Sequence, residues 1–253
     1  MTIASLAMYP FTHLQPAYNR LWQAVGEQLS VDVPPLNWDL PSDLACRRDD
    51  LLVGQTCGWP LITELAPKVH VIGTFDCDVD GAVDGTYRSV LVSASDESLA
   101  DIVARPDLKV AANSRDSLSG WISLLAVAAA ADVEFGAVEW TGSHAASVEA
   151  VRQGRAGLAS IDAVSWAHLG ETGLSVVGHG PRVPCLPLVT SASTAGDLVE
   201  DLRRAFDTAV SSPEMAGACA TLRIRGFVDR RLVDYEELSA LAQTRVSRRG
   251  PHP

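Results

Sequence analysis

The stretch Thr141-Gly-Ser-His-Ala-Ala-Ser-Val-Glu-Ala-Val-Arg-Gln-Gly-Arg-Ala-Gly-Leu-Ala-Ser-Ile-Asp162 indicates the fold most directly. It predicts a tight turn at Gly142, a helix that begins after Ser143 and ends at Gly154, and a short apolar strand that ends at Asp162. Glycine accepts the left-handed backbone of turns and helix ends, and a serine hydroxyl accepts hydrogen bonds from the first free amides of a helix. The stretch is therefore typical of an α/β unit.

The start of this predicted helix displays Ser143, His144 and free backbone amides. Such a helix start suits a carboxylate, phosphate or phosphonate, because amides and the helix dipole attract negative charge. The alternative is that Ser143 only caps the helix and His144 only packs. The stretch alone leaves both interpretations open.

The same alternation of strands and helices extends along the chain in both directions. Apolar runs predict strands, and apolar spacing of three and four residues predicts helices. The predicted strands are 3–8, 51–54, 69–75, 87–94, 108–112, 135–140, 157–161, 174–177 and 183–190, with 222–228 either a strand or an irregular arm. The predicted helices are 13–29, 61–65, 98–104, 118–129, 197–210 and 235–242. This order predicts an α/β fold with mainly parallel sheets and helices on both faces.

Two extended segments, 87–94 and 183–190, lack the usual helix between neighbouring strands. We expect them to be two crossing hinge strands between two lobes. The first lobe would comprise residues 1–88 and 188–253, and the second lobe, residues 89–187, would be inserted into it. Ligands of such folds bind between lobes, at strand ends and helix starts.

The composition excludes several classes of partner. The chain has 253 residues, 47% of them hydrophobic, and 20 Lys and Arg against 31 Asp and Glu give a net charge of −11. Nucleic-acid binding depends on neutralising phosphates, so an acidic chain is a poor match for it. No apolar run approaches the roughly 18 residues that span a bilayer. We therefore expect a small-molecule ligand, no nucleic acid and no membrane insertion.

The N-terminal segment and the cysteines both indicate the cytoplasm. Residues 1–8 have no basic start and no long apolar run, so we expect no signal peptide. The cysteines are scattered and odd in number: Cys46, Cys57, Cys77, Cys185 and Cys219. No pair or cluster with metal-ligand spacing is present, and no glycine-rich nucleotide loop is found. We expect no metal and no cofactor.

The ordered motifs of residues 3–240 resemble the phosphate/phosphite/phosphonate-type substrate-binding proteins of ABC transporters. The stretch 141–162 resembles the family's Gly-Ser-His helix start. Gly85-Thr-Tyr87-Arg-Ser-Val resembles its Tyr-x-Ser crossing strand. Asn113-Ser-Arg-Asp-Ser117-Leu-Ser119-Gly120 resembles its Ser/Thr-rich helix start, and Gln55-Thr-Cys-Gly-Trp-Pro resembles a first-lobe loop in members without a signal peptide.

This resemblance implies a two-lobed type 2 periplasmic-binding-protein fold that closes on a small, anionic ligand. In it Ser117, Ser119 and the amides at Gly120 would bind the head group, His144 would donate from the second helix start, and Tyr87 would contribute its hydroxyl. Further residues expected near the ligand are Ser143, Asp162, Tyr9, Thr56 and Cys57. An ABC permease or a cytosolic protein would be the partner.

Two residues depart from the family pattern. Leu118 takes the place of a hydroxyl residue in the usual Ser-Thr-Ser, and Asp116 precedes Ser117. A carboxylate there can favour a helix start, but it would repel an anion if it pointed inward. The ligand is therefore left open among phosphate, phosphonate and carboxylate compounds.

Two weaker sites are present. The loop with Asp76, Asp78, Asp80 and Asp84 matches the first part of a calcium loop, although the bidentate Glu that completes such a loop is replaced by Tyr87. Cys57 follows a strand in a glycine-containing loop where a nucleophile would fit, although no histidine is near in sequence. A solvated acidic loop and a ligand-facing backbone are the simpler interpretations.

Three functions remain open. The first is a solute-binding or sensor protein. The second is a cytosolic enzyme on the same fold, similar to menaquinone-pathway or thiamine-precursor enzymes, with His144, Cys57 or Asp162 as acid/base or nucleophile. The third, an interaction module with an empty cleft, explains none of the motifs.

Overall fold

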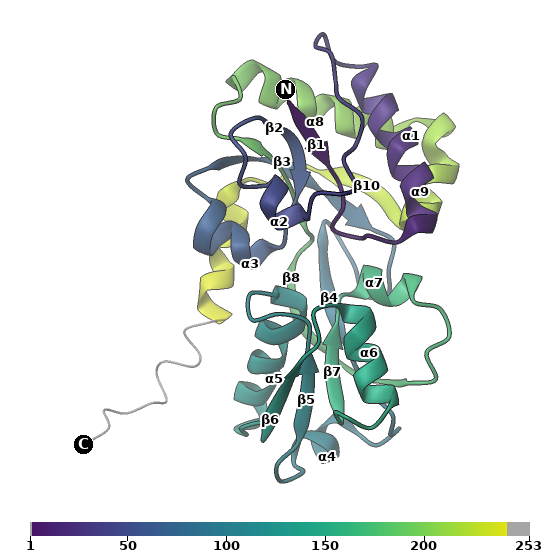
Figure 1. The fold of residues 1–253 in the computed structure, drawn as a ribbon, viewed down its shortest axis with the longest axis vertical. Coiled ribbons are helices and arrows are strands. Elements are labelled where there is room, and N and C mark those ends of the chain that lie inside the picture. The colour runs from purple at the N-terminus through teal and green to yellow at the C-terminus, as the bar shows by residue number, and fades with distance from the viewer. Residues whose placement is uncertain (1, 242–253) are drawn as a thin grey trace, which may run out of the picture. The chain divides into compact units, whose positions relative to one another are not determined.

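The computed structural model describes residues 2–241. Two compact units form. Residues up to 86 together with 184–236 make unit 1, and residues 87–183 together with the described residues after 236 make unit 2. The chain passes into unit 2 after Thr86 and returns after Val183 (Figure 1). No described helix is long and apolar enough to span a membrane.

Unit 1 is built on a five-stranded sheet with the order β1-β2-β9-β3-β10. The strands are β1 Ile3–Ser5, β2 Leu51–Gln55, β9 Pro187–Ser191, β3 Val69–Cys77 and β10 Ile224–Val228. The helical segments are η1 Thr12–Leu14, α1 Gln15–Gly26, α2 Ser42–Ala45, α3 Gly58–Pro60, η2 Leu61–Leu65, α8 Gly196–Ser211, η4 Pro213–Met215, α9 Ala216–Leu222 and η5 Leu232–Leu238. The segment 222–228 is thus a strand at the sheet edge.

The core of unit 1 forms where the apolar face of α8 meets the sheet. Phe206 lies at its centre, with ring centroids 5.9 Å from Phe75, 6.1 Å from Phe227 and 6.3 Å from Trp22. These rings come from β3, β10 and α1. Such aromatic pairs stabilise a core beyond the area they bury. The amphipathic helix predicted over 197–210 is therefore confirmed, and its apolar face is the one that packs.

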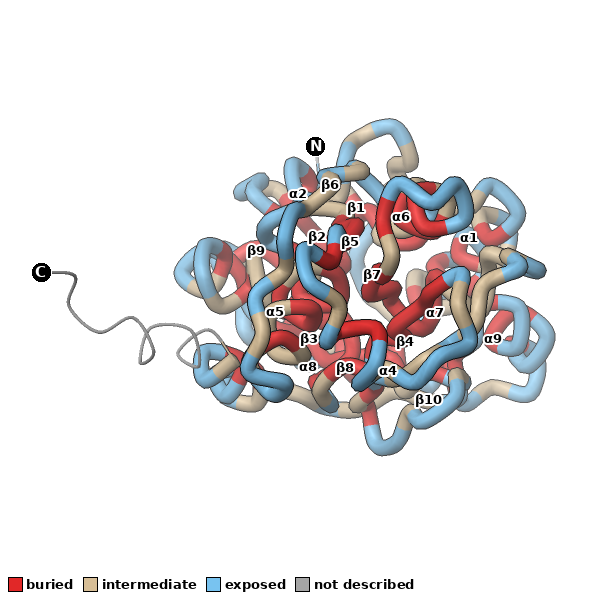
Figure 2. Tube along the Cα trace, turned by 90° about the horizontal axis from the view of Figure 1, so that it is seen from below, coloured by how far each residue is buried: buried red, intermediate tan, exposed pale blue. Residues whose placement is uncertain are grey.

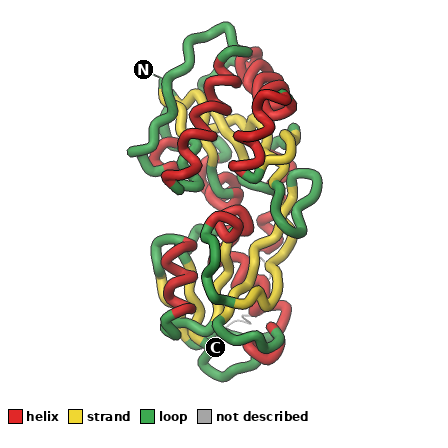
Figure 3. Tube along the Cα trace, turned by 90° about the vertical axis from the view of Figure 1, so that its right-hand side faces the viewer, coloured by secondary structure: helices red, strands yellow, loops and turns green. Residues whose placement is uncertain are grey.

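Unit 2 has a second five-stranded sheet, with the order β6-β5-β7-β4-β8. Its strands are β6 Ala137–Trp140, β5 Lys109–Ala112, β7 Leu158–Ile161, β4 Thr86–Ser93 and β8 Ser175–Pro184. The helical segments are α4 Leu99–Val103, η3 Leu118–Ile122, α5 Ser123–Ala131, α6 His144–Arg152 and α7 Ala163–His168. Figure 3 shows helices outside the strands in each unit, and Figure 2 shows that buried residues follow the central strands.

Alternating side chains of the unit 2 strands form two separate cores. Val90, Val92 and Ala111 pack with α6 on one face, whereas Leu91 and Val110 pack with α4 and α5 on the other. Successive residues of a strand point to opposite faces, so a strand covered on both sides is apolar throughout. This explains why these strands appear in the sequence as continuous apolar runs.

The sheets are mixed rather than mainly parallel, which corrects the prediction. In unit 1, β1 and β2 pair in parallel, whereas β9 runs antiparallel to β2 and β3, and β10 runs antiparallel to β3. In unit 2, β5 pairs in parallel with β6 and β7, but β4 is antiparallel to β7. Strands that enter a sheet without a crossover helix are free to run antiparallel. The segments next to the two unit boundaries, β4 and β9, do so.

The stretch 141–162 folds as predicted. Gly142 and Gly154 have φ of 84° and 70°, in the region that favours glycine. The Ser143 hydroxyl caps α6 by accepting from Ala146 N at 3.1 Å. The helix buries Val148 and Val151 before the chain enters β7.

Candidate functional site

The first half of the site is the helix start that follows β5. Ser117 is the N-cap of a continuous helix formed by η3 and α5, and its hydroxyl accepts from Gly120 N at 3.0 Å. A Cβ on Gly120 would lie 2.0 Å from Asn113 Oδ1, so only glycine fits here without displacing that side chain. Ser117, Ser119 and Gly120 are all buried. The sequence-predicted helix start is thus a closely packed polar corner.

The second half joins it through one hydrogen bond. Ser119 Oγ lies 3.0 Å from His144 Nε2, which connects η3 to the first residue of α6. Ser160 Oγ of β7 donates to the backbone carbonyl of Ser119 at 2.6 Å. Three elements that are distant in sequence therefore meet at Ser119.

Burial favours the neutral form of His144. Burial lowers its pKa from the usual value, and the opposing charge of Asp162 raises it by less. Although part of the residue reaches solvent, its Nδ1 is enclosed and has no hydrogen-bond partner among the described residues. The ring therefore enters the site as an uncharged donor and acceptor.

The Ser119–His144 pair holds one polar hydrogen that their mutual bond does not use. A neutral imidazole carries one N–H, and the serine carries one O–H. If Ser119 donates to Nε2, the ring proton is on Nδ1; if Nε2 donates, the serine hydroxyl is the remaining donor. In either tautomer one polar hydrogen of the pair is not used in their mutual bond.

Tyr87 and Asp162 form a neighbouring buried pair. Tyr87 OH donates to Asp162 Oδ2 at 2.8 Å, and Asp162 Oδ1 accepts from Ser165 N as the N-cap of α7. Tyr87 is 1% exposed and Asp162 is 2% exposed. Both oxygens of this carboxylate thus accept a hydrogen bond. The pair ties β4 to the end of β7.

The two departures from the family pattern have different outcomes. Leu118 is 2% exposed and belongs to the buried apolar residues of unit 2, whereas Asp116 is exposed. The leucine therefore replaces a hydroxyl by core packing. Ser143 is also exposed and serves as the cap of α6.

The sequence-predicted residues of unit 1 lie near the end of β2. Thr56 is 3% exposed, its amide donates to Pro187 O at 3.1 Å, and Cys57 is the half-buried N-cap of α3. Tyr9 is 5% exposed and follows the end of β1. These three residues stay proposals for ligand contact.

Two amide side chains were missed by sequence reasoning. Gln55 ends β2 and Asn113 follows β5, and each keeps a buried side-chain oxygen without a hydrogen-bond partner in the described part of the chain. A buried polar atom without a partner costs free energy, so such atoms mark places where a ligand or water binds. Their position in the sequence could have indicated them as candidates, because polar residues directly after strands gather at ligand sites.

The first carboxylate of the acidic loop is held by contacts within the protein. Asp76 pairs with Arg225 at 2.9 Å and accepts from Gly85 N at 3.0 Å, and this pairing lowers the pKa of its carboxyl although burial opposes it. Within residues 2–241 no group of three or more His, Cys, Asp or Glu side chains gathers as a metal site. The carboxylate at position 76 instead joins β3 to β10.

A comparison with protein families decides the identity. Residues 62–235 match the family described as "ABC transporter, phosphonate, periplasmic substrate-binding protein". The chain belongs to this family. It is therefore a substrate-binding protein of the phosphonate type, as the motifs around Ser119 and His144 predicted. No curated protein matches the chain.

Solved structures support the fold of this phosphonate-type binding protein. A binding protein component of an ABC phosphonate transporter from Pseudomonas aeruginosa superposes with a TM-score of 0.78 at 17% identity, covering 98% of this chain and 88% of the other. A Prochlorococcus marinus protein in complex with methylphosphonate has a TM-score of 0.73 at 15% identity, covering 96% and 97%. An R. palustris protein with adipate has a TM-score of 0.61 at 13% identity, covering 96% of each chain. At such identities these likenesses establish the type 2 fold.

Proposed function

We propose that this protein binds a small anionic ligand, with a phosphonate, phosphate or carboxylate head group held by Ser119 and His144 of unit 2. The observation that carries the proposal is the uncommitted donor of the Ser119–His144 pair, which lies beside the capped start of a long helix. A neutral donor and helix-start amides suit an anion. Ser117 and Gly120 complete the head-group contacts.

Asp162 is consistent with an anionic ligand despite its own charge. Both of its oxygens accept hydrogen bonds, from Tyr87 and from the amide of Ser165, which disperses the negative charge. We propose that Asp162 and Tyr87 position the end of β7, and that Tyr9, Thr56, Cys57 and Ser143 contribute contacts to the rest of the ligand. The buried oxygen of Asn113, which lies beside Gly120 in unit 2, would accept from a donor on that ligand.

The neighbours support the breadth of the ligand class. One is a complex with methylphosphonate and another is a complex with adipate, so related folds take both phosphonate and dicarboxylate compounds. Both compounds carry a compact anionic group. We therefore propose the head-group chemistry and not one compound.

A thermal-shift screen tests this proposal. Methylphosphonate, phosphite, phosphate, malate and adipate are added to the wild type, to His144→Ala and to the matched control His70→Ala, whose histidine is exposed on β3. A ligand at 100 times its Kd adds about 3 kcal/mol, which raises the Tm by several degrees. We expect this rise for at least one anion in the wild type and the control, and its loss in His144→Ala.

Two results would contradict the proposal. One is no stabilisation by any of the anions in the wild type. The other is equal stabilisation of the wild type and His144→Ala, which would place the head group elsewhere. Isothermal titration with the best anion then gives the change in Kd.

Transport, catalysis and location are separate parts of the proposal. Membership of the family implies an ABC permease as partner, and we propose binding without turnover. Phosphorus or proton NMR of the ligand after incubation tests for turnover. We expect the ligand to be recovered unchanged. The sequence predicts a cytoplasmic location whereas the family is described as periplasmic, and cell fractionation decides between them.

A further inference from the structure

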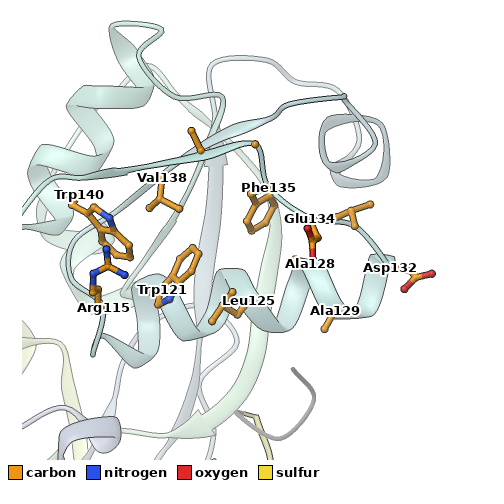
Figure 4. A pocket seen from close by; sticks show the side chains of 13 residues that line it. Arg115, Trp121, Leu125, Ala128, Ala129, Asp132, Glu134, Phe135, Val138 and Trp140 are labelled. Atoms are coloured by element: carbon orange, nitrogen blue, oxygen red, sulfur yellow. The ribbon is translucent and has the colours of Figure 1, made fainter. Parts of the chain in front are cut away.

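A groove of about 640 Å³ lies on unit 2, and neither Ser119 nor His144 lines it. It runs between α5 and β6, and Figure 4 shows its aromatic and aliphatic side chains pointing into it. Trp121 and Trp140 meet edge to face with ring centroids 5.2 Å apart. Trp140 is nevertheless 38% exposed. An exposed apolar surface of this kind is typical of an interaction site. The side chains that matter below are Trp121, Leu125, Phe135, Val138 and Trp140.

The groove borders an unpaired sheet edge. β6 is the last strand of the unit 2 sheet and pairs with β5 alone among the described strands. The amide of Gly136 donates inward to Leu108 O at 2.9 Å. Because this direction alternates along a strand, the N–H and C=O groups of Ala137 and Glu139 point outward. Such an edge is a template for another strand.

The two ends of the groove carry opposite charges. Arg115 lies over the Trp140 ring at 4.5 Å from its centroid, and Glu134 lies at the other end (Figure 4). Neither side chain forms an ion pair within residues 2–241. A surface with opposite charges at its ends complements a copy of itself turned by 180°.

We propose that β6 pairs antiparallel with β6 of a second copy of this chain, about a two-fold axis that passes through Val138. Residues directly opposite in an antiparallel pair point to the same face. An axis at Val138 keeps the groove-facing residues together. Trp140 then lies opposite Gly136 of the partner subunit. Arg115 approaches Glu134 of the partner subunit.

A register with its axis at Glu139 also matches the faces. It would place two carboxylates directly opposite each other, and like charges in that position are destabilising. In the Val138 register, Ala137 of each subunit lies opposite Glu139 of the partner subunit. These two pairs exchange main-chain hydrogen bonds. The two grooves then join into one apolar interior.

Sedimentation velocity on the full chain tests the proposal. The protein concentration runs from about 1 to about 200 µM, a range that covers weak association. We expect a dimer in the wild type. Arg115→Glu and Glu134→Arg each raise the dimer dissociation constant about tenfold or more, because each creates two like-charge contacts. An equal mixture of the two variants restores the dimer, since every contact is then between opposite charges. Glu171→Arg, an exposed site outside the groove, is the matched control.

Cysteine cross-linking tests the register independently. Val138→Cys places two thiols on the axis, where mild oxidation gives a covalent dimer, whereas the adjacent Glu139→Cys cross-links far less. A wild type that is monomeric throughout the range overturns the proposal, as does a mixture no better than the single variants. A monomer whose groove takes up an unrelated extended peptide also overturns it.

Discussion

The helix formed by η3 and α5 contributes to two regions that contrast in chemistry. Its first turn places Ser117 and Ser119 in a buried polar corner, where each hydroxyl has a hydrogen-bond partner. Its side places Trp121 and Leu125 along a groove that remains partly open. A buried polar group and a large exposed apolar patch are the two departures from the usual distribution that carry information. This contrast is the basis of the two proposals, a small anionic ligand at the polar corner and a second copy of the chain at the groove.

The largest effect is expected for Asp162→Ala in the polar region. The change removes the acceptor of the buried Tyr87 hydroxyl and the cap of α7. A lost buried acceptor and a lost cap together cost about 2–4 kcal/mol. We expect the Tm to fall by roughly 5–10 °C in differential scanning calorimetry.

Asp162→Asn is the matched control for this change. The amide keeps one oxygen acceptor in the same place, so a smaller loss is expected. Equal losses in the two variants would show that charge, and not the hydrogen-bond geometry, holds this corner together.

The next effect separates two serines four residues apart on the same helix. Ser119→Ala removes the bond to His144 and should weaken ligand binding about tenfold, or roughly 1.4 kcal/mol. Ser123 Oγ is buried and has no partner among residues 2–241, so Ser123→Ala should leave stability unchanged or raise it slightly. Titration calorimetry and thermal unfolding measure the two changes. If Ser119→Ala and Ser123→Ala change the ligand affinity equally, the proposed role of Ser119 in binding is wrong.

The pH dependence of stability reports on His144. Burial lowers its folded-state pKa below the unfolded value of about 6.5. The unfolded chain therefore binds the proton first, and stability present above about pH 6.5 is lost as the pH falls toward the folded-state pKa. We expect the wild type to lose more Tm than His144→Gln between about pH 7.5 and pH 5.5. Parallel curves for the two proteins would mean that the ring is not buried in solution.

The smallest effect is expected in the groove. Leu125→Ala shortens a half-buried side chain and should cost about 1 kcal/mol, at the low end for such changes. The affinity for the anionic ligand should stay within about twofold, below 0.5 kcal/mol, because the groove does not include Ser119 or His144. Titration at a concentration where the chain is monomeric gives this value. A large loss of affinity would show that the groove and the Ser119–His144 pair are energetically coupled.

Local chemistry made much of the fold predictable. Gly142, Ser143 and Gly154 each act within a few residues of their own position, so their roles in the turn, cap and helix end follow from the sequence. The apolar runs of β5 and β7 likewise follow from burial on both faces. The strand directions were not predictable, because pairing partners such as β9 and β3 are distant in sequence.

Two hydrogen bonds could not be predicted, because each joins residues that are far apart in the sequence. The Ser119–His144 bond joins residues 25 apart, and the Tyr87–Asp162 bond joins residues 75 apart. The sequence indicated these four residues individually, by resemblance and by position. Whether each one pairs with a ligand or with another residue depends on packing that only the folded chain has.

The sequence by itself determined the α/β class, the family and the helix starts that suit an anion, because these depend on periodicity and on residues acting locally. The tertiary structure alone decided the mixed sheets, the lowered pKa of His144 and the groove between α5 and β6. Each of these three features depends on segments that are distant in sequence and exclude water where they pack together. Solvent exclusion fixes a pKa, a hydrogen-bond partner and a surface, and no local pattern encodes it.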